Sequence, residues 1–232
     1  MAKKPPDIHL FTASTMNGWK PLIFLQEAGV DYDLTHVDFG KREQKSAEYR
    51  RLNPNGRIPT ILDRGNDDFV VFESNAILWY LAEKFERFLP EGPKGRSQVL
   101  QWLMFQVSGV GPMMGQAMFF QRIAAPQGHC DAYAIERCVG ESRRLLEVVD
   151  AQLAGKSYLL GDVYTIADMA MYPYTRAYSW AKISVEGLPH LQAWFERLDA
   201  RPAIQRAFEK PVHCTSNTTC SIVPSNGKGA RR

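Results

Sequence analysis

The sequence predicts a two-part fold, in which an α/β N-terminal domain is followed by an all-α helical-bundle domain. Three observations support this fold class. Residues 8–85 alternate between short apolar strand patterns and helical patterns. A polar connector rich in Pro and Gly, Leu89 to Arg96, comes next. Beyond it, apolar residues recur every three or four positions, as in packed helices, and no segment has the pattern of a sheet strand.

The elements of the first part can be placed in chain order. IHLFT is a short apolar strand, and the helix that contains LIFLQEAG ends at Gly29. Further strands are expected at YDLTHV, IPTILD and FVVF, before a helix over SNAILWYLAEKF. By the right-handed crossover rule, we expect the first two strands to be parallel. This order is the plan of a thioredoxin-like domain.

The second part has well-marked helix boundaries. One helical run extends through Phe120, and another extends from Ala132 to Leu153 with its apolar residues on one stripe. TIAD, Thr165 to Asp168, has the form of a capping box and predicts a helix start. The chain is therefore divided into an N-terminal domain (1–88), a linker (89–96), an all-α domain (97–211) and a flexible tail (212–232).

The composition favours a small-molecule partner. With 45% hydrophobic and 23% charged residues, the chain is typical of a soluble globular protein. The net charge of +3 is spread along the chain, which argues against a nucleic-acid partner. No run approaches the about 20 apolar residues of a membrane span, and the N-terminus lacks the apolar core of a signal peptide. We expect a cytoplasmic protein without a membrane partner.

The four cysteines do not predict a disulfide framework or a metal site. Cys130, Cys138, Cys214 and Cys220 show neither a CxxC spacing nor an accompanying His pattern for zinc. We therefore expect no bound metal.

The first candidate site is the turn FTASTMNGWK, residues 11–20. It offers the polar side chains of Ser14, Thr15 and Asn17, but no cysteine, acid or histidine. Hydroxyl and amide donors at the positive end of a helix can stabilise an anion. The turn itself, however, provides no evident nucleophile.

The second candidate is GRIPTIL, residues 56–62, where a proline opens a strand. If the Ile58–Pro59 bond is cis, the backbone amide and carbonyl of Ile58 turn outward and can pair with an extended, peptide-like ligand. A plain loop proline is the alternative.

The third candidate is FESNAILWYL, where a strand gives way to a helix. Ser74 is expected to cap this helix, whose first N–H groups favour a carboxylate, and Glu73 can take an ammonium group. Together they can hold both ends of an amino acid. A capping serine beside a solvated glutamate is the alternative.

These motifs resemble those of cytosolic glutathione transferases. NGWK, NPNGRIPTI, FESNAILWYLAEK and YTIADMAMYP carry the resemblance, which extends from Ile8 to Pro211. TMNGWK and AAPQGHCDAYAIERCVGESRRL are similar to the Nu-class and Ure2-like branch, the glutathione-dependent disulfide-bond oxidoreductases.

The resemblance implies a set of site residues. Thr15 and Asn17 would be catalytic and lie beside the sulfur, and Glu73 and Ser74 would hold the γ-glutamyl end. Arg137 would reach glutathione from the helical domain; a surface ion pair with Glu141 is the alternative. The implied glutathione-binding set is Asn17, Gln44, Arg57, Ile58, Glu73, Ser74 and Arg137.

The implied chemistry agrees with the residue types. Glutathione is a co-substrate that brings its own thiol, with a free pKa of ~8.5, so the protein needs only to stabilise the thiolate. We expect an enzyme that reduces small disulfides with glutathione. Conjugation of electrophiles is the alternative activity, and a non-catalytic glutathione-binding regulatory module is a second alternative. The family also implies a homodimer.

Overall fold

The computed structural model describes residues 5–210, and its first half contains one four-stranded sheet. The strands lie in the order β2-β1-β3-β4. All strands expected from the sequence are confirmed: β1 (Ile8–Thr12), β2 (Tyr32–His36), β3 (Thr60–Asp63) and β4 (Phe69–Phe72).

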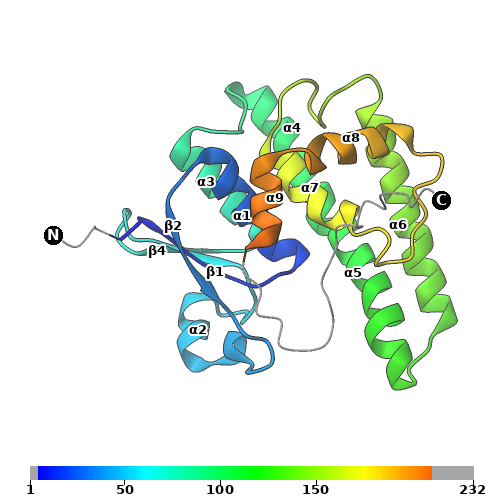
Figure 1. The fold of residues 1–232 in the computed structure, drawn as a ribbon, viewed down its shortest axis with the longest axis horizontal. Coiled ribbons are helices and arrows are strands. Elements are labelled where there is room, and N and C mark those ends of the chain that lie inside the picture. Colours follow the sequence, from blue (N-terminus) through cyan, green and yellow to red (C-terminus); the bar gives the residue numbers. More distant parts are fainter. Residues whose placement is uncertain (1–4, 211–232) are drawn as a thin grey trace, which may run out of the picture.

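The sheet topology is that of a thioredoxin-like domain. Helix α1 (Met16–Ala28) connects β1 to the parallel strand β2, whereas β3 runs antiparallel to both β1 and β4. Gly29 ends α1 in a left-handed conformation, with φ of 65°. Figure 1 shows α1 and α3 (Ser74–Phe85) on one side of the sheet and the short α2 (Ala47–Leu52) on the other. The α/β prediction is confirmed.

The second half is helical, as the sequence predicts. Helix α4 (Gly92–Phe105) begins within the segment expected as a connector, with Pro93 in its first turn, where an intrahelical N–H is not needed. The other helices are α5 (Gly111–Phe119), α6 (Ala132–Leu153), α7 (Ile166–Arg176), α8 (Pro189–Asp199) and α9 (Pro202–Glu209). Two π-helical turns, Gln106–Val110 and Phe120–Ala124, flank α5, and short 3₁₀ turns occupy Glu43–Lys45 and Ala125–Gln127.

Two further expectations concern a membrane span and the C-terminal tail. Between residues 5 and 210, none of the helices combines the length and the apolar character needed to cross a membrane. The predicted tail, 212–232, lies outside the described residues.

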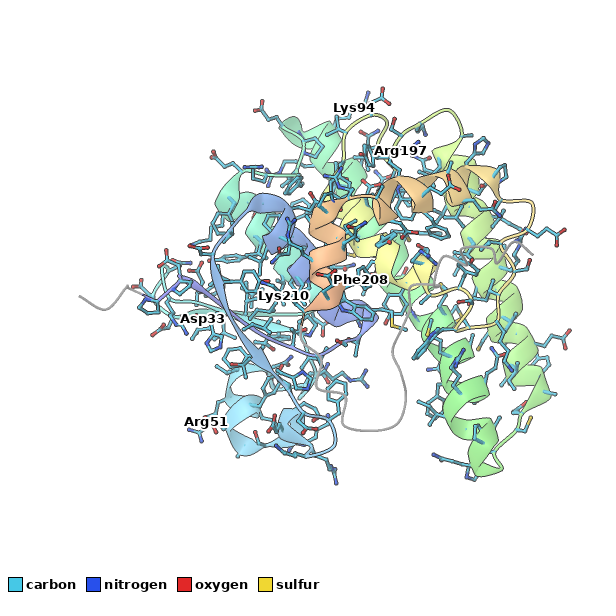
Figure 2. The ribbon with its side chains drawn as sticks, viewed as in Figure 1. Asp33, Arg51, Lys94, Arg197, Phe208 and Lys210 are labelled. Atoms are coloured by element: carbon cyan, nitrogen blue, oxygen red, sulfur yellow. The ribbon has the colours of Figure 1, made fainter. Side chains whose placement is uncertain are left out.

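The two halves are joined through α1, which contacts both α7 and α9. Phe208 of α9, labelled in Figure 2, places its ring 4.6 Å from that of Trp19 in α1. Arg201, just before α9, donates from two nitrogens to the carboxylate of Glu27 in α1, at 2.6 and 2.8 Å. Because aromatic contacts and a forked ion pair act together here, the position of α1 is determined by both halves.

The predicted capping box at the start of α7 is confirmed, and its acid is buried. The carboxylate of Asp168 accepts hydrogen bonds from the backbone N–H of Leu159 (3.0 Å), the backbone N–H of Thr165 (3.1 Å) and the indole of Trp194 (3.0 Å). Burial raises the pKa of Asp168 to about 6. The carboxylate thus connects α7, α8 and the preceding loop.

We expect Asp168→Ala to lower the free energy of unfolding by about 3 kcal/mol, because it leaves several buried donors without an acceptor. Asp131→Ala is the matched control, since Asp131 caps α6 through the N–H of Ala134 in an exposed position. That change should cost about 1 kcal/mol. Urea unfolding of both variants measures the difference, and equal losses would contradict the role given to Asp168.

Candidate active site

A pocket of about 400 Å³ opens where α1 begins, beside the loop that leads into β3. Its volume is within the range of small-molecule sites. The structure here brings together five of the residues predicted from sequence: Thr15, Asn17, Gln44, Arg57 and Ile58. Phe39, Lys45 and Gly56 complete the lining.

Thr15 is the N-cap of α1, and its side chain is oriented by that role. Its Oγ1 accepts a hydrogen bond from the backbone N–H of Gly18 at 3.0 Å. This bond uses a lone pair of the oxygen, so the hydroxyl proton can still be donated into the pocket. The neighbouring Ser14 has a buried Oγ without a hydrogen-bond partner among the described residues.

Gly18 allows the first turn of α1 to lie against the end of β1. A Cβ atom at this position would be 2.0 Å from the carbonyl oxygen of Ala13 and 2.6 Å from Oγ1 of Thr12. The Thr12 hydroxyl donates to the Gly18 carbonyl at 3.1 Å, which holds the two segments together. The glycine of NGWK is therefore required by packing, and it keeps Asn17 at the pocket wall.

The loop before β3 is held by partly buried hydrogen bonds, and its Ile58–Pro59 bond is cis, one of the two alternatives that the sequence left open. The carbonyl of Arg57 accepts from Nδ2 of Asn53 at 2.7 Å and from the hydroxyl of Tyr49 at 2.9 Å. Gly56 has φ of 60°, and a Cβ there would be 2.8 Å from the Gln44 carbonyl. These constraints present the backbone of Ile58 at the pocket.

The polar groups of the pocket are suited to a ligand with carboxylates and amides. Among the described residues that line it, the charged ones, Lys45 and Arg57, are both cationic. Oε1 of Gln44 is buried without a hydrogen-bond partner in the described part of the chain. A buried acceptor of this kind calls for a donor, which a ligand with an N–H group can supply.

Ser74 lies next to the pocket, but the prediction that it caps α3 is wrong. Ser74 is the first residue of α3, and Glu73 occupies the cap position, with φ of 70° and no capping bond from its side chain. The Ser74 hydroxyl instead accepts from Nζ of Lys20 (3.2 Å) and donates to Oδ1 of Asn17 (3.2 Å). Because the Ser74 hydroxyl binds these two side chains, it does not bind the first N–H groups of α3. Glu73 is exposed, in a backbone conformation that is uncommon for a side-chain-bearing residue and often found at functional sites.

Asn17 is held from two sides. Its Oδ1 accepts from Ser74, and its Nδ2 donates to the hydroxyl of Tyr174 in α7 at 3.2 Å. Burial raises the pKa of Tyr174, so its hydroxyl stays protonated near neutral pH. Tyr174 and Lys20 are site residues that sequence reasoning did not identify, although Lys20 lies in the motif NGWK and Tyr174 directly follows YTIADMAMYP.

Arg137 is exposed on α6 and does not line the pocket. The alternative of a surface pair with Glu141 is met only in part: Glu141 accepts two hydrogen bonds from Arg144, at 2.7 and 2.8 Å, which together with the charge of Arg137 lower the pKa of Glu141. The guanidinium of Arg137 thus remains accessible from solvent.

Within residues 5–210, no group of three or more His, Cys, Asp or Glu side chains gathers as metal ligands would. Cys130, which is exposed, and Cys138, which is buried, are free thiols.

Family models match both halves of the chain. One described as glutathione S-transferase, N-terminal domain, matches residues 6–83, and one described as glutathione S-transferase, C-terminal domain, matches residues 111–202. The pocket described above lies within the first of these segments.

Individual relatives agree with the family models. The disulfide-bond oxidoreductase YfcG of Escherichia coli is 42% identical over 207 residues, which cover 88% of this chain and 95% of that protein. A glutathione transferase from Burkholderia graminis, solved with two glutathione molecules bound per subunit, has a TM-score of 0.84 at 38% identity, covering 90% of each chain. One from Pseudomonas putida, solved with one glutathione disulfide per subunit, has a TM-score of 0.83 at 37% identity, covering 90% of this chain and 94% of that one. The chain belongs to the glutathione S-transferase family.

Proposed function

We propose that this protein is a glutathione-dependent thiol–disulfide oxidoreductase of the Nu-class and Ure2-like branch. The observation that carries the proposal is the pocket wall itself, where Thr15 and Asn17 present a hydroxyl and an amide and none of the described lining residues is a cysteine. Such a wall suits a ligand that brings its own sulfur. The naming of YfcG as a disulfide-bond oxidoreductase agrees with this chemistry.

The pocket accommodates glutathione as a peptide. The backbone of Ile58, next to the cis bond, pairs with the cysteinyl unit, and Gln44 and Arg57 contact the same ligand from the pocket wall. Glu73 and Ser74, at the start of α3, hold the γ-glutamyl end, where helix N–H groups favour its carboxylate. The cations Lys45 and Arg57 suit the carboxylates of the tripeptide.

Activation of the thiol is the first catalytic task. At the positive end of α1, the Thr15 hydroxyl and an N–H of Asn17 donate to the sulfur and lower the thiol pKa from its free value of ~8.5. Each unit of this shift corresponds to about 1.4 kcal/mol of preferential binding to the thiolate. One or two donors are sufficient for appreciable thiolate at neutral pH.

Disulfide exchange then follows. The glutathione thiolate attacks one sulfur of the substrate disulfide; a new S–S bond forms, and the other sulfur leaves as a thiolate that takes up a proton. A second glutathione thiolate attacks the mixed disulfide at the glutathionyl sulfur, which yields glutathione disulfide and the second reduced thiol. Relatives solved with two glutathiones or with glutathione disulfide are consistent with a pocket that receives both sulfurs.

Arg137 is assigned to the carboxylate of a glutathione molecule held from the α6 side. Its guanidinium is exposed and makes no hydrogen bond to Glu141, whose hydrogen bonds come from Arg144. A guanidinium can hold a carboxylate through two parallel hydrogen bonds.

The proposal includes a homodimer in the cytoplasm. Edge strand β4 exposes Phe69 and Phe72, and α4 exposes Leu100 and Met104, which are apolar side chains that an interface would cover. The free thiols of Cys130 and Cys138 fit a compartment that glutathione keeps reducing.

The function is tested by comparing two activities of the purified wild-type protein. Reduction of a small glutathionyl mixed disulfide, followed as formation of glutathione disulfide, should exceed conjugation of an aryl halide by at least about tenfold in kcat/KM, because the pocket aligns two sulfurs. A reversed ratio would identify a conventional transferase. Glutathione binding without turnover of either substrate would identify a binding module.

Asn17→Ala should raise the kinetic pKa of bound glutathione and lower kcat for disulfide reduction about tenfold or more, because one donor to the thiolate is lost. The pH profile of kcat measures this effect. Asn66→Ala is the matched control, because it removes an exposed asparagine outside the pocket lining whose Nδ2 also donates to a tyrosine hydroxyl, that of Tyr80. A wild-type profile in Asn17→Ala would assign activation to Thr15, Ser14 or the backbone.

Arg137→Ala should raise KM for the glutathione-derived substrate about tenfold, as expected when a charge-assisted hydrogen bond to a carboxylate is lost. Arg144→Ala is the matched control, since it removes an exposed arginine from the same helix but one that binds Glu141. If the two variants have equal KM values, Arg137 does not bind the glutathione-derived substrate.

A further inference from the structure

Lys20 is a buried cation beneath the pocket. Its relative exposure is 1%, and its Nζ donates to Oγ of Ser74 (3.2 Å), Oδ1 of Asn75 (2.9 Å) and Oε1 of Gln106 (2.7 Å). The same nitrogen lies 5.5 Å from the ring centroid of Tyr174. All three donor positions of the ammonium are therefore occupied by neutral oxygens.

A lysine in this position is costly to the fold. Burial lowers its pKa to about 7, and the nearby Glu73 carboxylate opposes that shift. A well-packed apolar side chain of similar length is often no less stabilising than a buried charge. Packing alone therefore does not require an ammonium group here. The role of Lys20 is indicated instead by its contact with Ser74, which in turn binds Asn17 of the pocket.

The ammonium determines the direction of the hydrogen bonds that reach Asn17. In its protonated form Lys20 can only donate, so Ser74 Oγ accepts from it, and the single Ser74 proton is then available for Oδ1 of Asn17. This bond selects one of the two amide orientations of Asn17. In that orientation the NH₂ group faces Tyr174, with its second N–H available to the pocket that Asn17 lines.

The helical half of the protein holds Lys20 in place. Gln106, its closest partner, is buried in the π-helical turn between α4 and α5. Asn75 accepts from Lys20, and its Nδ2 donates to the Leu103 carbonyl at 2.9 Å and to Oε1 of Gln106 at 3.0 Å. The chain of hydrogen bonds thus extends from α4 through Lys20 and Ser74 to Asn17.

We propose that Lys20 is a positioning residue for thiolate formation: it holds the Ser74 hydroxyl as an acceptor and thereby fixes the Asn17 amide with an N–H toward the sulfur. The inference rests on the proposed function for the identity of the sulfur ligand. It assigns the orientation of Asn17 to a cation that lies outside the pocket lining.

The direct test of this role is to measure the thiol pKa of bound glutathione. It is obtained from the ultraviolet absorbance of the thiolate as a function of pH, at saturating glutathione. Lys20→Met should raise this pKa by about one unit, which is a tenfold loss of thiolate at a fixed lower pH. Calorimetry should show a much smaller change in glutathione affinity. Lys20→Arg, which keeps a donor-only cation, should recover part of the shift.

A double-mutant cycle distinguishes two routes by which Lys20 could affect the thiol pKa. One is the hydrogen-bond relay from Lys20 through Ser74 to Asn17, and the other is a direct effect of the ammonium charge on the thiolate. If the relay operates, Ser74→Ala shifts the thiol pKa in the same direction, and adding Lys20→Met to it produces little further shift. Fully additive shifts would mean that the ammonium acts through space, and the proposal would be overturned. Ser74→Ala also tests the relay if Lys20→Met does not fold.

Arg201→Met is the matched structural control, because it removes a different contact between the two halves, the ion pair with Glu27. It should lower the melting temperature and leave the thiol pKa unchanged. The inference fails if Lys20→Met behaves like this control. Since the titration needs no turnover, a wild-type protein that lowers the thiol pKa but reduces no disulfide would contradict the proposed function and leave the role of Lys20 intact.

Discussion

The close contact between the first turn of α1 and the end of β1 is the constraint on which the site depends. Without a Cβ at Gly18, the backbone of α1 lies directly against Ala13, and the Thr12 hydroxyl binds the Gly18 carbonyl. This contact directs the positive end of α1 at the pocket and places Thr15 and Asn17 on its wall. The same helix also packs on α7 and α9, so any shift of α1 would disturb both halves of the protein.

A site built on this contact has donors that can stabilise an anion, and none of the described residues that line it is a cysteine. Thr15 retains a hydroxyl proton while it caps the helix, and Asn17 has one amide orientation because both of its polar atoms are bonded. Preorganised donors of this kind need no rearrangement when the anion forms, which is why they are effective in catalysis. The cations Lys45 and Arg57 add attraction for an acidic ligand.

Much of the fold and part of the site follow from local patterns in the sequence. The strands, the Gly29 helix end and the capping box of Thr165 and Asp168 were all predicted and are all present, whereas the cis Ile58–Pro59 bond was one of two alternatives that local sequence left open. The capping role of Ser74 was predicted wrongly, because a serine before a helical pattern is usually a cap. Here its hydroxyl binds Lys20 and Asn17, which lie 54 and 57 positions away in the chain.

The sequence by itself determined the order of the elements, the turn chemistry and the donors of the pocket, because helix caps, strand patterns and proline positions depend on neighbouring residues. Only the tertiary structure decided the direction in which these donors face. Asn17 and Lys20 of α1 meet Ser74 and Asn75 of α3, Gln106 of the π-helical turn and Tyr174 of α7. No periodicity shows that a lysine is buried among them. The physical reason is that a buried polar network is specified by the geometry of donors and acceptors across the packed core, which arises only when the two halves come together.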